Sequence, residues 1–217
     1  MVNEVTTIFS NEDRFPINRE FIDQYALPVG DIYGDELFTG YFADYAGMAR
    51  KYRPKRIFEI GVRYGYTGLV FVHAVKRLRG APNVEYLGID DESYHGGSNA
   101  RANLNFSQAF PTAEMKAMTW NSITMGLPPE IGTFDLIHID GNHEARWALH
   151  DLKQCWPLLN LGGVIMMDDA SRVADDPAFH IFGAVQMFFA EREHTPELIE
   201  WQYHENQRNH VYIRKCG

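Results

Sequence analysis

Residues 134–170 read FDLIHIDGNHEARWALHDLKQCWPLLNLGGVIMMDDA, and this stretch decides the fold class. The apolar runs at 134–140 and 163–168 are short, as buried strands are, and the segment 143–156 between them carries apolar side chains at helical spacing. Two strands joined by a helix normally lie parallel in one sheet, because the chain must cross over to begin the second strand at the same end. The stretch therefore predicts part of a parallel sheet.

The same alternation continues outward in both directions. We expect strands at 56–60, 84–90, 113–119, 134–140, 163–168, 196–203 and 209–214, and helices at 36–52, 66–79, 98–109, 143–156 and 178–191. This order predicts an α/β, Rossmann-like, doubly wound and mostly parallel seven-stranded sheet with helices on both faces. The last two strands would form an antiparallel hairpin at the C-terminal edge. Residues 35–217 would be one domain, and the polar and aromatic residues 1–34 an N-terminal arm or lid.

Composition and charge exclude several classes of protein. The 217 residues are 45% hydrophobic and 23% charged, which argues against a disordered, fibrous or membrane protein. The net charge of −9 would repel a nucleic-acid backbone. Two cysteines form no spaced disulfide framework, and the first residues lack a secretory leader, so we expect a cytoplasmic protein.

Acidic residues stand where the predicted strands end. Open parallel sheets bind ligands at that edge, and here Asp90, Asp140, Asp168 and Asp169 end three strands. Neighbouring strands would bring Asp140, Asp168 and Asp169 together, which is costly without a cation. Three carboxylates suit Mg²⁺, with Mn²⁺ also possible. The alternative is that Asp168 and Asp169 are merely solvated.

A glycine turn follows the first strand of the sheet, in the segment EIGVRYGYT at 59–67. Gly61 lets the chain leave the strand sharply, and Gly65 would let the backbone approach a ligand. The dinucleotide fingerprint G-x-G-x-x-G needs its second glycine two residues after Gly61, where Arg63 stands, which argues against a nicotinamide cofactor. Asp90 could bind both hydroxyls of a ribose, so the pattern favours a nucleoside ligand without a diphosphate. The alternative is that both glycines are only turn residues.

Histidines accompany the acidic residues. His143, three residues after Asp140 at the start of the predicted helix, is suited to act as a general base for a hydroxyl group. A surface position without a role is the alternative. His138 lies within a buried strand and is expected to be structural, while the roles of His150 and His180 stay open.

Together these motifs resemble the class I S-adenosylmethionine-dependent, metal-dependent O-methyltransferases of the catechol type. The segment IDGNHEA, with its histidine, resembles the group that methylates macrolide sugars and includes cephalosporin-hydroxylase-like proteins. The catechol and caffeoyl-coenzyme A branches usually have lysine at the position of this histidine. The resemblance implies a cofactor site and a metal site. The cofactor site would comprise Glu59, Gly61, Arg63, Gly65 and Thr67 around the methionine part, Asp90 at the ribose, and Asn121 and Ser122 at the adenine. The metal ligands would be Asp140, Asp168 and Asp169, with His143 and Asp140 catalytic.

The resulting hypothesis is methyl transfer to a Mg²⁺-coordinated hydroxyl of a small molecule, a sugar or aromatic group of a natural product. One alternative is a metal-dependent hydrolase or lyase using the same carboxylates and His143. Another is a non-catalytic partner subunit that only binds the cofactor. No nucleic acid or membrane is expected as a partner, and a homodimer is a family-level expectation.

Overall fold

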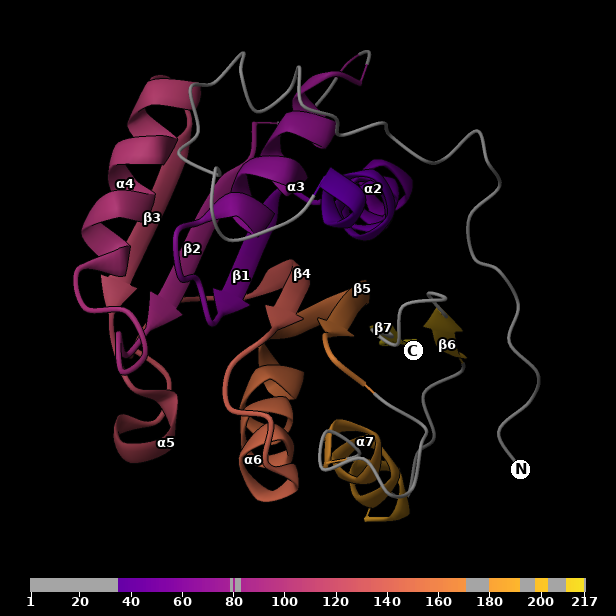
Figure 1. Ribbon diagram of the computed structural model, residues 1–217. Helices are drawn as coiled ribbons and strands as arrows, with labels where there is room; N and C mark the ends of the chain where they lie inside the picture. The colour runs from indigo at the N-terminus through magenta and orange to yellow at the C-terminus, as the bar shows by residue number, and fades with distance from the viewer. Residues whose placement is uncertain are drawn as a thin grey trace.

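The computed structural model describes residues 35–78, 80, 83–170, 180–191, 198–202 and 210–216. The predicted arm at 1–34 lies outside this range, as does most of the segment 171–180. Within the described residues, seven strands form one sheet in the order β3-β2-β1-β4-β5-β7-β6 (Figure 1). The strands are β1 (Arg56–Ile60), β2 (Glu85–Asp90), β3 (Glu114–Thr119), β4 (Phe134–Ile139), β5 (Leu159–Met167), β6 (Leu198–Gln202) and β7 (His210–Arg214).

The strand pairing confirms the predicted topology. β1 pairs in parallel with β2 and with β4, β2 with β3, and β4 with β5. β7 is antiparallel to both β5 and β6, so the C-terminal hairpin extends the sheet at its β5 edge. The strand order reverses direction at β1 and β4, which places a ligand crevice at the carboxyl ends of those two strands.

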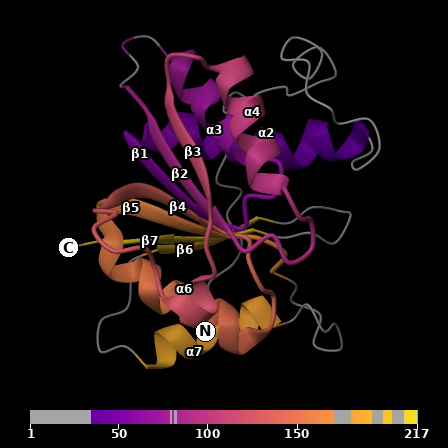
Figure 2. The ribbon, with the colours of Figure 1, turned by 90° about the vertical axis from the view of Figure 1, so that its left-hand side faces the viewer.

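Helices cover both faces of the sheet, as Figures 1 and 2 show. α2 (Asp35–Tyr52), α3 (Tyr66–Lys76) and α4 (Ser98–Ala109) lie on one face. α6 (Ala145–Cys155) and α7 (His180–Ala190) lie on the other, together with the short α5 (Ser122–Met125). A single 3₁₀ turn, Trp156–Leu158, follows α6. None of the helices in the described ranges is both long and apolar enough to span a bilayer.

Alternating side chains of each strand build two separate cores. On β1, Ile57 packs under α2 and α3, whereas Phe58 packs under α6 and α7. On β4, Leu136 likewise belongs to the first of these cores and Ile137 to the second. A central strand that is apolar on both sides is the reason these segments read as continuous hydrophobic runs.

Some element boundaries differ from the sequence prediction. α6 begins at Ala145, so His143 lies in the loop before the helix and not in its first turn. The Asn142 side chain accepts a hydrogen bond from the Glu144 backbone N–H at 2.9 Å, and this local turn competes with helix formation. β5 begins at Leu159, earlier than predicted, despite containing two glycines. The four-residue α5 was not predicted, because it is too short to show a period.

Candidate active site

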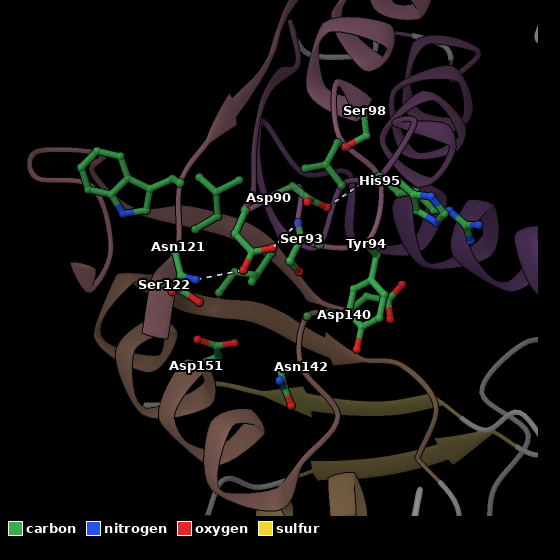
Figure 3. Close-up of a pocket in the computed structure, with 18 of the residues that line it drawn as sticks. Asp90, Ser93, Tyr94, His95, Ser98, Asn121, Ser122, Asp140, Asn142 and Asp151 are labelled. Carbon is green, nitrogen blue, oxygen red and sulfur yellow. Dashed lines mark hydrogen bonds between the residues drawn. The ribbon is translucent and has the colours of Figure 1, made fainter. Parts of the chain in front are cut away.

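A cavity of about 620 Å³ opens at the carboxyl ends of the parallel strands (Figure 3). Most of the residues singled out in the sequence line it. These are Gly61, Arg63, Thr67, Asp90, Asn121, Ser122, Asp140, His143, Asp168 and Asp169. Two of the predicted residues, Glu59 and Gly65, do not line it.

The turn after β1 is locked to the ends of two neighbouring strands. The Gly61 N–H donates to the Ile89 carbonyl at 2.9 Å, and the Asp140 N–H donates to the Ile60 carbonyl at 2.8 Å. Gly61 has φ +91°, and a Cβ there would lie 2.0 Å from the Asp140 carbonyl oxygen. Glycine is therefore required here by the packing of one loop on another, in addition to the sharp exit from the strand.

Gly65 serves a different purpose from the predicted one. It precedes α3 with φ +80°, and a Cβ would lie 2.5 Å from the ring of Phe106 on α4. The absence of a side chain lets α4 pack closely against the start of α3. The prediction that Gly65 gives a ligand access to the backbone is not supported, because Gly65 is not part of the cavity wall.

Glu59 also lies away from the cavity. Because strand residues alternate, its side chain faces α2 and α3, where it accepts a hydrogen bond from the Tyr86 hydroxyl and lies 2.7 Å from His138 Nδ1. Burial raises the pKa of Glu59, although the contacts with His138 and Tyr86 act in the opposite direction. Glu59 therefore joins β1, β2 and β4 within the core. His138 is buried in this group, as its position within a strand predicted.

Two adjacent carboxylates at the end of β2 organise one side of the cavity. Asp90 accepts hydrogen bonds from the backbone N–H groups of Arg63 at 2.8 Å and Glu92 at 2.7 Å. Asp91 accepts from the Asn121 side chain at 2.9 Å, which ties the β2 loop to the loop before α5. Only Asp90 was predicted to bind a ligand, whereas both residues line the cavity.

His143 lies between two carboxylates at the other side of the cavity. Its Nε2 is 3.2 Å from Asp140 Oδ1 and its Nδ1 is 3.6 Å from Asp169 Oδ2. All three side chains are partly exposed, and they offer potential metal-ligating atoms within 4.8 Å of one another. Asp169 has φ +50°, a left-handed conformation that costs about 1 kcal/mol outside glycine. The chain thus holds Asp169 in a strained conformation at the edge of the cavity.

Asp168 lies in a second, buried group. It accepts a hydrogen bond from the Tyr45 hydroxyl at 2.9 Å, and its Oδ1 is 2.8 Å from Nδ1 of His210 on β7. With His138 and Asp140 it also brings ligand atoms within 4.8 Å of one another. The three carboxylates predicted to lie together therefore belong to two groups that share Asp140. Asp169 lies in the partly exposed group, and Asp168 lies in the buried one.

Residues 58–170, just over half of the chain, match the sequence profile of a family described as a methyltransferase domain. The chain belongs to this methyltransferase family. A comparison with curated protein sequences gave no match.

Solved structures of other methyltransferases share the fold. One is a Podospora anserina methyltransferase with bound SAH, 18% identical, with a TM-score of 0.66 over 95% of this chain and 92% of that one. Another is an O-methyltransferase from Bacillus cereus in complex with SAH, 14% identical, with a TM-score of 0.64 over 97% and 94%. A third is the O-methyltransferase TomG from Streptomyces achromogenes, involved in tomaymycin synthesis and bound to SAM, 16% identical, with a TM-score of 0.59 over 89% and 86%.

The methyltransferase cavity contains residues that the sequence analysis did not select. Tyr94 and His95, in the loop after β2, line it, and the His95 ring packs 5.6 Å from that of Tyr64. Asp151 of α6 also lines it while being only 1% exposed. No sequence signal distinguished Asp151 from a solvated carboxylate.

Proposed function

We propose that this methyltransferase transfers the methyl group of S-adenosylmethionine to a hydroxyl oxygen of a small molecule. The observation that carries the proposal is that one cavity joins two carboxylates at the end of β2 to the cluster of Asp140, His143 and Asp169. The carboxylates at the end of β2 are suited to bind a nucleoside. The cluster around His143 is suited to remove a proton from an acceptor. A substrate bridging the two would have its reacting groups already oriented.

The cofactor would lie across the turn after β1. Asp90 and Asp91 offer carboxylate oxygens to the ribose hydroxyls, in addition to the hydrogen bonds that they accept from backbone N–H groups and from the Asn121 side chain. The Gly61 turn and Thr67, at the start of α3, would hold the methionine part. This orientation directs the sulfonium methyl toward the Asp140 side of the cavity.

The acceptor hydroxyl would be bound beside His143. Its oxygen attacks the methyl carbon while the carbon–sulfur bond breaks, and the bonding electrons of that bond remain on sulfur as the neutral thioether. The hydroxyl proton passes to the His143 imidazole, whose two nitrogens lie next to the Asp140 and Asp169 carboxylates, so the resulting positive charge would be stabilised.

The donor set of this cluster fits a hard divalent cation. Asp140 and Asp169 present carboxylate oxygens at the edge of the cavity, where water and an acceptor could complete the coordination. Mg²⁺ or Mn²⁺ bound there would lower the pKa of the acceptor hydroxyl. Asp168 would lie next to this site without binding the cation directly, because its carboxylate oxygens already contact the Tyr45 hydroxyl and His210 Nδ1.

The acceptor class is proposed from the resemblance to natural-product O-methyltransferases and from the fold shared with an enzyme of tomaymycin synthesis. We propose a hydroxyl on a sugar or an aromatic ring of such a product. The test is formation of S-adenosylhomocysteine from labelled S-adenosylmethionine with a panel of catechols and glycosides, with Mg²⁺ and with EDTA. Turnover with Mg²⁺ that EDTA abolishes is expected. Full activity in EDTA would contradict the role of the cation, and hydrolysis of a test ester without any methyl transfer would favour a metal-dependent hydrolase.

A further inference from the structure

Asp151 presents a buried carboxylate to the cavity. It lies on α6, its side chain is 1% exposed, and its Oδ1 has no hydrogen-bond partner among the described residues. Figure 3 shows the carboxylate pointing toward the Asn121 and Ser122 side of the cavity. Since buried carboxylates are normally hydrogen-bonded, an unpartnered oxygen at a cavity wall indicates a ligand that donates to it.

The loop after β4 packs beside the Asp151 carboxylate. A Cβ at Gly141 would lie 3.4 Å from Asp151 Oδ2, an ordinary contact distance, and 3.1 Å from the Ile60 side chain. Burial raises the pKa of Asp151 to about 6, while the Ser122 hydroxyl and His150 act to lower it. The carboxylate is therefore mostly ionised at neutral pH, although its ionisation is costly in this buried position. A donor on a bound ligand would reduce this cost.

The position of Asp151 relative to the other cavity groups suggests which part of a ligand it meets. The ribose is placed at Asp90 and Asp91, and the reacting end lies at His143. The heterocyclic base would then occupy the remaining side, next to the loop before α5, which is joined to Asp91 through Asn121. On adenine, the exocyclic amino group is the hydrogen-bond donor of the base edge, whereas the accessible ring nitrogens are acceptors.

We propose that Asp151 accepts a hydrogen bond from the exocyclic amino group of the cofactor's adenine and so selects adenine among purines. This inference rests on the proposed function, because it assumes an adenosyl cofactor. Asp151 is thereby a specificity-determining residue contributed by α6. A solely structural role, with Asp151 only holding Ser122 and the start of α5 in place, is the alternative to be tested.

The experiment is a calorimetric titration with S-adenosylhomocysteine and with its 6-deamino analogue, in which purine replaces adenine. The analogue lacks the amino group and adds no new donor. The wild-type protein should bind S-adenosylhomocysteine at least about tenfold more tightly than the analogue. In Asp151→Ala this preference should fall to within about threefold, because S-adenosylhomocysteine loses affinity while the analogue does not. Glu191→Gln, an exposed change on the surface near α7, is the control and should keep the wild-type preference.

Three results would overturn the inference. Equal affinity of the wild-type protein for both ligands would do so without any variant, and would leave the proposed function intact. Weakening of both ligands by the same factor in Asp151→Ala would assign Asp151 a structural role. Absence of binding of either ligand to the wild-type protein would contradict the proposed function itself. If Asp151→Ala fails to fold, Asp151→Asn, which retains the volume, should show a reduced preference.

Discussion

The α-carbon of Gly61 faces the backbone of Asp140 so closely that a Cβ at Gly61 would lie 2.0 Å from the Asp140 carbonyl oxygen. The turn proposed to hold the cofactor and the strand end proposed to hold the acceptor are therefore in direct backbone contact. The Asp140 N–H also donates to the Ile60 carbonyl at 2.8 Å. A change in one loop must displace the other.

We predict that Gly61→Ala lowers both stability and activity. The new Cβ would clash with backbone, which cannot move cheaply, and residue 61 would keep an unfavourable φ. We expect a loss of about 2–3 kcal/mol in the free energy of unfolding, measured by urea titration, together with reduced turnover.

Gly162→Ala is the matched control for this prediction. Gly162 has φ +80°, but a Cβ there would meet no atom within 4 Å. Gly162→Ala should lower the free energy of unfolding by only about 1 kcal/mol, the conformational cost of a side chain at this φ, and should leave turnover per folded molecule unchanged. Equal losses in the two variants would contradict the proposed contact between the loops.

Asp168 and Asp169 should respond differently to the same substitution. Asp168→Asn removes a charged partner from buried His210 and Tyr45, so the free energy of unfolding should fall by about 2 kcal/mol. Asp169→Asn alters a partly exposed carboxylate and should mainly weaken Mg²⁺ binding and turnover. Thermal unfolding and metal titration of both variants measure the difference. Identical effects would mean that the two aspartates act as one ligand pair.

The ligand-free protein should show a pH-dependent effect of Asp151→Asn. The pKa of Asp151 in the folded state is raised from 3.8 to about 6, so the folded protein holds this proton more tightly than the unfolded chain. The stabilisation that the protonated Asp151 gives the folded state is complete below about pH 4 and is lost as the pH rises through about 6. Asparagine cannot ionise, so above about pH 7 the free energy of unfolding of the variant should exceed that of the wild type by on the order of 2–3 kcal/mol. Denaturant titrations across this range test it, and a difference independent of pH would contradict it.

His143→Gln should strongly reduce turnover without unfolding the protein. The imidazole is partly exposed, and glutamine cannot accept a proton, so we expect a reduction in kcat of about 10²–10⁴ with little change in cofactor affinity. His180→Gln, on an exposed residue at the start of α7 that does not line the cavity, should retain the wild-type kcat. A His143→Gln enzyme with wild-type kcat would remove the base from the mechanism.

The sequence predicted the fold well because periodic apolar strands and helices are local signals. The strands ending at Asp90 and Asp140 were found from such runs, and parallel topology then brought their ends to one edge. The short α5 and the loop position of His143 were not predicted, because each depends on single hydrogen bonds near a turn.

Within the site, the sequence found the residues but not always the directions of their side chains. Glu59 was expected at the cavity, yet it lies in a buried group formed with residues distant in the chain. Asp168 lines the cavity as expected, but its carboxylate also pairs with Tyr45 and His210. Their partners Tyr86, Tyr45 and His210 come from other elements. Such long-range pairing has no signature in a single sequence, and neither does the burial of Asp151.

The central claim, that the cavity binds S-adenosylmethionine, is tested most directly by calorimetric titration of the wild-type protein, supplied with Mg²⁺, with S-adenosylmethionine and with NADH. The account predicts micromolar binding of S-adenosylmethionine and no binding of NADH, because Arg63 occupies the turn where a dinucleotide fingerprint has glycine. Failure of S-adenosylmethionine to bind would contradict the proposed function.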